Sequence, residues 1–151
     1  VCSSDLSKFM GEINDNNCIT IRTSFIGHEL KNKWGLLSWF ISQEKKVNGF
    51  KNAIYSGLTT LEISKIIYNL ILPNKKLNGL YHIASKPIDK FSLLGLINKI
   101  YEKDITINKD YSFIIDKSLD YSKFKDVTGY EPIEWEYALK ELKNFQKTNY
   151  A

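Results

Sequence analysis

Residues 18–24 read CITIRTS, and this stretch decides the fold class of the chain. Its β-branched residues predict a largely buried β-strand. A loop is expected from Gly27 to Lys33, and a helix over residues 36–43 follows it, with Leu36, Leu37, Phe40 and Ile41 on one face. A strand that leads through a loop into an amphipathic helix is typical of α/β proteins.

The same alternation continues on both sides of this stretch. The end of a helix is predicted over 7–14 and a turn at 15–17. Later segments predict short strands at 46–50, 53–55, 80–84 and 105–107, and helices at 59–72, 91–101, 121–128 and after Pro132. The strands are short and their connections irregular. We therefore expect an α/β chain in which a small lobe is attached to the last elements of a doubly wound sheet.

Three helices carry apolar stripes at helical spacing, which indicates the faces that they bury. The stripes are Ile63, Ile66, Ile67, Leu70 and Ile71; Leu93, Leu96, Ile97, Ile100 and Tyr101; and Trp135, Leu139, Leu142 and Phe145. The first of these helices begins with a capping box, in which Thr59 accepts from the helix and Glu62 reaches back. Gly129 is expected to end the helix over 121–128.

Composition excludes several classes of protein. Apolar residues make up 43% and charged residues 25%, as in ordinary globular chains, and no apolar run approaches the ~20 residues that span a bilayer. The net charge of +4 is spread along the chain without a basic block, which argues against nucleic acid as a partner. Two cysteines are too few for a disulfide framework, so a reducing cytoplasm is the expected location.

No single motif indicates a function: a glycine-rich phosphate loop, a GxSxG elbow and metal-ligand spacing are all missing, and no metal site is expected. Six short sequence segments in a fixed order are more informative. They are Lys8-x-x-Gly11-Glu12, Ile21 to Gly27, Gly57 to Thr60, Gly79 to Ile83, Asp116 to Asp120, and Gly129-Tyr130-x-Pro132. The ordered set resembles the C-terminal half of the dTDP-4-dehydrorhamnose reductases, which are extended short-chain dehydrogenases of the NAD-dependent epimerase/dehydratase superfamily.

The resemblance covers Ser7 to Phe145 and implies how the chain is divided. Residues 7–30 would be the last elements of a truncated Rossmann-like NAD(P)-binding fold, and residues 31–151 a small α/β substrate-binding lobe with returning elements. Residues 1–6 read unlike the rest and match one translation frame of a sequencing-adapter oligonucleotide. We expect them to be an artefact, with the N-terminal half of the parent protein missing.

The resemblance also implies catalytic and cofactor-binding residues. The family uses a Tyr-x-x-x-Lys pair on one helix; Lys8 matches the lysine, and Ser4 stands where the tyrosine is expected. Residues four apart share a helix face, so the ammonium group lies beside the phenol, lowers its pKa and holds the nicotinamide ribose. Lys8 and Ser24 are thus expected to contact NADPH or NADH.

For the substrate, a nucleotide-linked deoxysugar, the resemblance implies a second set of residues. These are Phe25, Trp34, Gly35, Tyr55, Ser56, Gly57 and Thr59. Trp34 and Gly35 begin a helix whose N-terminus suits a diphosphate, with Lys31, Lys33 or Lys46 as a source of charge. Arg22 is expected to pair with a buried carboxylate and His82 to lie in the core, whereas a role for His28 beside the cleft stays open.

The function implied for the full-length parent is NAD(P)H-dependent reduction of a 4-keto-deoxysugar nucleotide, in the synthesis of cell-surface polysaccharide precursors. The chain as given is expected to be inactive, and a homodimer stays open. Two alternatives remain: a sugar-nucleotide epimerase or dehydratase of the same superfamily, and a non-catalytic regulatory subunit that binds cofactor. The short lobe favours the reductase.

Overall fold

The structure is a computed structural model that describes residues 3–13, 15, 17–29, 31 and 34–149. The elements, in chain order, are α1 (Ser3–Met10), β1 (Ile19–Arg22), β2 (Phe25–Ile26), α2 (Leu36–Ile41), β3 (Lys46–Phe50), β4 (Ala53–Tyr55), β5 (Leu58–Thr59), α3 (Thr60–Ile66), the π-helix η1 (Ile67–Ile71), β6 (Gly79–His82), β7 (Ile88–Asp89), α4 (Lys90–Ile100), β8 (Thr106–Asp110), β9 (Ile115–Lys117), α5 (Ser122–Thr128) and α6 (Trp135–Asn149). Strands and helices alternate, as the sequence predicts.

Most strand pairs join distant parts of the chain in parallel. β1 pairs with β6, β2 with β5, and β3 with β8. β4 lies between β7, which is antiparallel to it, and β9, which is parallel. The prediction of a mixed α/β chain is confirmed, with small parallel sheets in place of one broad sheet.

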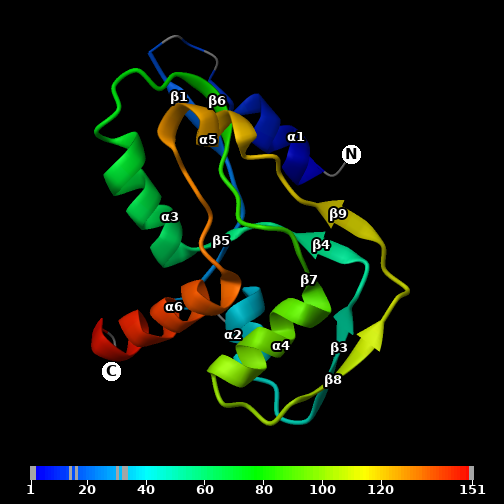
Figure 1. Ribbon diagram of the computed structural model, residues 1–151. Helices are drawn as coiled ribbons and strands as arrows, with labels where there is room; N and C mark the ends of the chain where they lie inside the picture. The colour runs from blue at the N-terminus through cyan, green and yellow to red at the C-terminus, as the bar shows by residue number, and fades with distance from the viewer. Residues whose placement is uncertain (1–2, 14, 16, 30, 32–33, 150–151) are drawn as a thin grey trace.

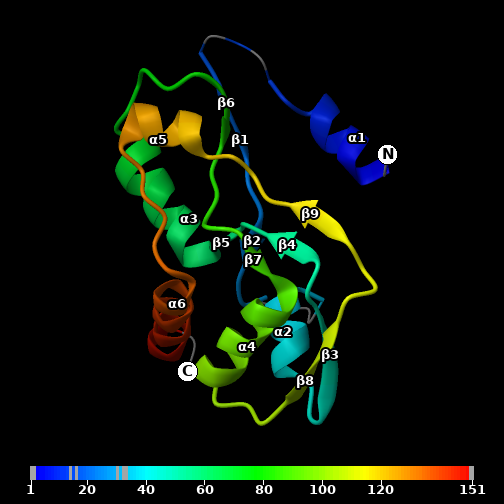
Figure 2. The same ribbon diagram turned by 45° about the vertical axis from the view of Figure 1, so that its right-hand side comes forward.

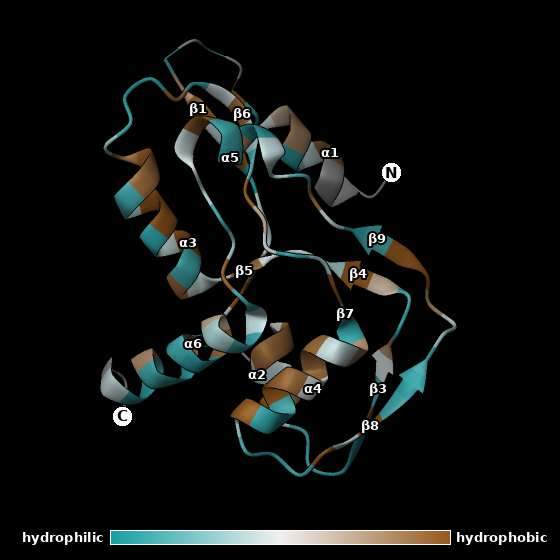
Figure 3. Ribbon diagram, viewed as in Figure 1, coloured by the Kyte–Doolittle hydropathy of each residue, from teal (hydrophilic) through white to brown (hydrophobic). Residues whose placement is uncertain are grey.

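Two hydrophobic clusters divide the molecule. Figures 1 and 2 show how the helices and strands that contribute to them are arranged. In the first, named the sheet cluster, the β1–β6 pair packs with α3, η1 and α5 around the fully buried Phe124 and Ile83. In the second, named the lobe cluster, α4 packs with α2, β3, β8 and α6 around Phe40, Leu94 and Leu139. Figure 3 shows the apolar colouring gathered on α2 and α4, which form the centre of the lobe cluster.

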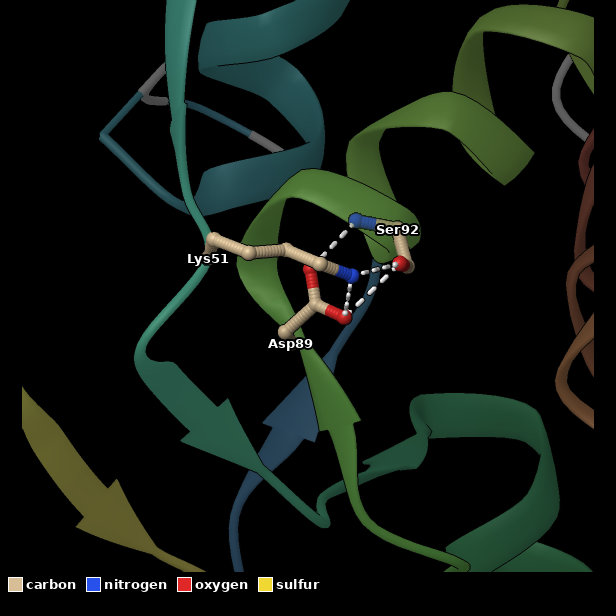
Figure 4. A network of polar contacts seen from close by, with 3 residues as sticks. All are labelled: Lys51, Asp89 and Ser92. Carbon is tan, nitrogen blue, oxygen red and sulfur yellow. Dashed lines mark hydrogen bonds and ion pairs between the residues drawn. The ribbon is translucent and has the colours of Figure 1, made fainter. Parts of the chain in front are cut away.

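A polar network fixes the start of α4 (Figure 4). Asp89 is the N-cap: its Oδ1 accepts from the backbone N–H of Ser92 at 2.9 Å, and its Oδ2 accepts from the Ser92 hydroxyl and the Lys51 ammonium group. Burial raises the pKa of Asp89, but the hydrogen bonds from Lys51 and Ser92 outweigh it and hold that pKa below its ordinary value. The network therefore ties α4 to the turn between β3 and β4.

Several predictions about burial are wrong. All four residues of β1 are half-buried, because among the described residues β1 has a strand partner, β6, on one side alone. Phe145 is 44% exposed on the last turns of α6. Ile67 is 38% exposed, because the helix widens into η1 there and leaves the helical phase that the stripe assumes.

Other predictions about local structure are confirmed, with shifted bounds. α5 ends at Gly129, which adopts φ +71°. The Thr59 hydroxyl accepts from the backbone N–H of Glu62 at 3.1 Å, which is half of the predicted capping box. Among the described residues the reverse bond from the Glu62 side chain does not form.

Candidate functional site

Three segments cross beyond the carboxyl ends of β1 and β6, where ligands bind in parallel α/β sheets. The backbone N–H of Leu58 donates to the carbonyl of Ser24 at 2.8 Å. The backbone N–H of Ser85 donates to the carbonyl of Ser56, also at 2.8 Å. Residues 56–58 are therefore held between the chain after β1 and the chain after β6.

Gly57 permits the closest approach in this crossing. A Cβ atom added to it would lie 2.0 Å from the Tyr55 hydroxyl oxygen and 2.6 Å from the carbonyl oxygen of Ser24. The structure thus brings together three residues that the sequence analysis assigns to the site: Ser24, Tyr55 and Gly57. Only glycine leaves room for the phenol at this position.

The Tyr55 ring is half-buried and packs against Trp135, with ring centroids 5.8 Å apart. Burial raises the pKa of its phenol well above the ordinary value, so the hydroxyl stays protonated at neutral pH. Among the described residues this hydroxyl makes no hydrogen bond. Every side-chain polar atom there that is fully enclosed does have a hydrogen-bond partner, so the Tyr55 hydroxyl is not fully enclosed. A protonated phenol without a partner among the described residues is an available hydrogen-bond donor.

Ser56 and Thr59 are buried, and their hydroxyls hold the backbone. The Ser56 Oγ accepts from the N–H of Leu119 at 2.8 Å, and the Thr59 Oγ1 caps α3 through the N–H of Glu62. Both residues lie in the crossing, where they shape the backbone beside Tyr55. Direct contact of either with a substrate stays a prediction.

Phe25 pairs with Leu58 beside the crossing, whereas the structure shows no contact of Trp34 or the half-buried Gly35 with it among the described residues. Phe25 in β2 is 64% exposed and Trp34 is 89% exposed. Gly35 is the N-cap of the short helix α2, and its N–H donates to the Glu29 carboxylate at 2.9 Å. An acidic side chain therefore takes the position at which the sequence analysis expects a diphosphate; of the lysines considered for it, Lys33 lies outside the described residues.

Lys8 lies on α1, whose C-terminal end is joined to β1 by an ion pair. Both Glu12 carboxylate oxygens accept from the Arg22 guanidinium, at 2.5 and 2.8 Å, so Arg22 pairs with a carboxylate as expected, but that carboxylate is half-buried and not buried. The hydrogen bond from Arg22 lowers the pKa of Glu12. The Lys8 side chain is exposed, and within the described part of the chain its ammonium group has no hydrogen bond or ion pair. Ser4 is also in α1, but its side chain lies outside the described residues, as do Val1 and Cys2.

The two histidines have different surroundings. His28 Nε2 lies 2.8 Å from the Tyr101 hydroxyl, at the end of α4, and burial lowers the pKa of His28. His82, on β6, pairs in register with Arg22 on β1. It is half-buried, so the prediction that it lies in the core is wrong. His28 therefore ties the loop after β2 to the lobe cluster.

Two residues of the site were missed by sequence reasoning. Ser85 is buried, and its hydroxyl donates to the Gly57 carbonyl at 2.6 Å. Trp135 backs the Tyr55 ring and donates through Nε1 to the Lys86 carbonyl at 2.8 Å. Ser85 directly follows the strand predicted at 80–84, so the rule that ligands bind at strand carboxyl ends was the signal that would have found it.

Comparisons with solved structures identify the fold. A dTDP-4-dehydrorhamnose reductase from Clostridium acetobutylicum superposes with a TM-score of 0.69 at 13% identity, over 85% of this chain and 49% of that one. The chain shares the fold of such sugar-nucleotide enzymes. The corresponding reductase from Bacillus anthracis, in complex with NADP, gives 0.65 at 16% identity (86% and 49%), and a dTDP-glucose 4,6-dehydratase of the same organism, in complex with NAD, gives 0.64 at 17% (87% and 45%).

The likeness to these sugar-nucleotide enzymes is one of fold, and it extends over about half of each solved chain. No family model and no curated protein matches the sequence. The expected fold class, Rossmann-like with a small α/β lobe, agrees with these neighbours. No helix among the described residues is long and apolar enough to cross a membrane.

Proposed function

We propose that this chain is the sugar-binding half of an NAD(P)H-dependent reductase that acts on the 4-keto group of a nucleotide-linked deoxysugar, such as dTDP-4-dehydrorhamnose. The observation that carries the proposal is the superposition on two such reductases at TM-scores of 0.65 and 0.69. The reaction would serve the synthesis of cell-surface polysaccharide precursors in the cytoplasm.

The residues at the cofactor side fit a nicotinamide dinucleotide. Lys8 offers an exposed ammonium group that is not engaged by other described residues, and the Glu12–Arg22 ion pair holds its helix at the carboxyl end of β1. Lys8 and Ser24 would hold the nicotinamide ribose, and the bound cofactor would supply hydride. Lys8 would also lower the pKa of a catalytic phenol one helical turn earlier, at the position of Ser4.

The residues at the substrate side fit a sugar. The Tyr55 phenol stays protonated at neutral pH, so its role is to donate a hydrogen bond to the substrate and not to transfer a proton. Phe25 offers an exposed ring for the sugar face. A diphosphate at the start of α2 would have to displace the Glu29 carboxylate from Gly35, so we expect it to lie away from that position.

The decisive experiment is to recover the upstream coding sequence and assay the full-length protein. A GxxGxxG motif after a strand and a tyrosine four residues before Lys8 are required, together with NADPH oxidation that depends on a 4-keto sugar nucleotide.

In that full-length protein Lys8→Met is expected to lower kcat by about 10²–10⁴-fold, while Lys45→Met, at an exposed lysine, serves as the control. The 151-residue chain alone should show no such oxidation. A full-length protein that lacks either feature contradicts the proposal, and one that keeps the motif but lacks the tyrosine points to a regulatory subunit.

A second candidate is an epimerase or dehydratase of sugar nucleotides. It is favoured by neighbours of similar TM-score, among them the dehydratase at 0.64 and a UDP-N-acetylglucosamine 4-epimerase from Bacillus cereus at 0.61. Product analysis separates the two: a reductase consumes one reduced cofactor per sugar, whereas an epimerase or dehydratase leaves the cofactor unchanged overall.

A further inference from the structure

Glu62, in the first turn of α3, is a carboxylate without a close partner. The residue is 7% exposed, and among the described residues its carboxylate accepts no hydrogen bond and forms no ion pair within 4 Å. Every fully enclosed side-chain polar atom in that part of the chain does have a partner. The carboxylate oxygens must therefore keep an opening, although the residue is more than nine-tenths buried.

The opening is a groove lined by residues of α3, η1 and α6 and by residues from 129–133. Figure 1 shows where α3 and α6 lie in the fold. Its volume is about 350 Å³, at the lower end of the range of small-molecule sites. The walls are apolar at Ile66 and Leu70 and aromatic at Tyr130 and Tyr137, with Glu62 among the polar groups.

Negative charge exceeds positive charge in the groove. The charged residues that line it are Glu62, Lys65, Glu131 and Glu141. Glu141 binds Lys65 at 2.7 Å, and Glu131 binds Lys125 at 2.5 Å, which leaves Glu62 with no cation at contact distance. Burial raises the pKa of Glu62, as expected for a carboxylate that is desolvated and incompletely neutralised.

We propose that this groove binds an organic cation, a guanidinium or primary ammonium group on a short apolar stem, which Glu62 receives. The cation would neutralise Glu62 and lie against the tyrosine rings, while the stem would contact Ile66 and Leu70. A metal ion does not fit, because the described residues contain no group of three acidic, histidine or cysteine side chains arranged to hold one. The residues that line the groove include none of Tyr55, Gly57 and Thr59, so this site does not depend on the proposed reductase function, although Thr59 caps α3 through the backbone N–H of Glu62.

The test is a titration of the 151-residue chain, followed by ¹H–¹⁵N NMR, with n-butylguanidinium and with its uncharged analogue n-butylurea. The cation should cause saturable shifts at the amides of Leu70 and Gly129, and n-butylurea should bind at least about tenfold more weakly. Glu62→Gln, which keeps the shape and the backbone bond to Thr59, should weaken n-butylguanidinium binding by a similar factor. Glu136→Gln, an α6 carboxylate outside the groove, is the matched control and should bind normally.

Three results would overturn the site. They are the lack of saturable shifts with the cation, equal affinity for the two probes, and unchanged affinity in Glu62→Gln. If Glu62→Gln does not fold, the ratio of the two probes in the unaltered chain still decides the matter.

Discussion

The Glu12–Arg22 ion pair makes the attachment of α1 dependent on pH. The pKa of the Glu12 carboxyl is lowered in the folded chain. Ionised Glu12 therefore stabilises the folded chain at pH values above 4.5, its ordinary pKa, and this stabilisation is lost as the pH falls through the lowered pKa. Arg22 and His82 are the basic side chains near it. We expect Glu12→Gln to lower the melting temperature at neutral pH, and the difference between the two proteins to shrink as the pH falls below 4.5. Thermal unfolding of both proteins across this range checks the prediction, and a difference that persists in acid contradicts it.

Gly57 provides a second test at the scale of one residue. Gly57→Ala places a methyl group against the Tyr55 hydroxyl and the Ser24 carbonyl, and the backbone oxygen cannot move aside easily. We expect a loss of about 1–3 kcal/mol in unfolding free energy. Gly95→Ala in α4, where an added Cβ meets nothing within 4 Å, is the matched control and should gain about 0.5–1 kcal/mol. Urea denaturation measures both, and equal effects would show that the crossing has spare room.

At the scale of the element, the Asp89 cap allows the helix cap and the ion pair to be separated. Asp89→Ala removes both, and we expect it to lower the unfolding free energy by about 0.5–2 kcal/mol. Asp89→Asn keeps a capping side chain and loses the charge partner of Lys51, so its cost should be below about 1 kcal/mol. Denaturant titration distinguishes them; if the two variants are equally unstable, the ion pair and not the cap fixes α4.

The elements also show what the sequence could predict. α3, α4 and α6 carry sustained apolar stripes, and they were predicted within a few residues. β2, β5 and β7 have two residues each, too few for any period, and they form because distant segments meet in space. For the same reason the sequence named Ser24, Tyr55 and Gly57 but missed Ser85 and Trp135, since the crossing that joins them is tertiary.

At the scale of the whole molecule, we expect a cavity in one hydrophobic cluster to destabilise mainly the elements of that cluster. Phe124→Ala should cost about 3–5 kcal/mol and Leu139→Ala about 2–5 kcal/mol, because both side chains are fully buried. We expect Phe124→Ala to reduce amide-exchange protection mainly in β6 and α5, and Leu139→Ala mainly in α4. Uniform loss of protection in either variant would mean that α6, which contacts both α3 and α4, couples the clusters into one unit.

The parallel pairs have a consequence for how the chain leaves the ribosome. Ile19 pairs with Gly79 and Lys46 with Thr106, so each strand meets a partner sixty positions later. At about 5–20 residues per second, translation delays each pairing by roughly 3–12 s. During that interval the backbone groups of β1 and β3 lack their native neighbours and are open to pairing with another nascent chain.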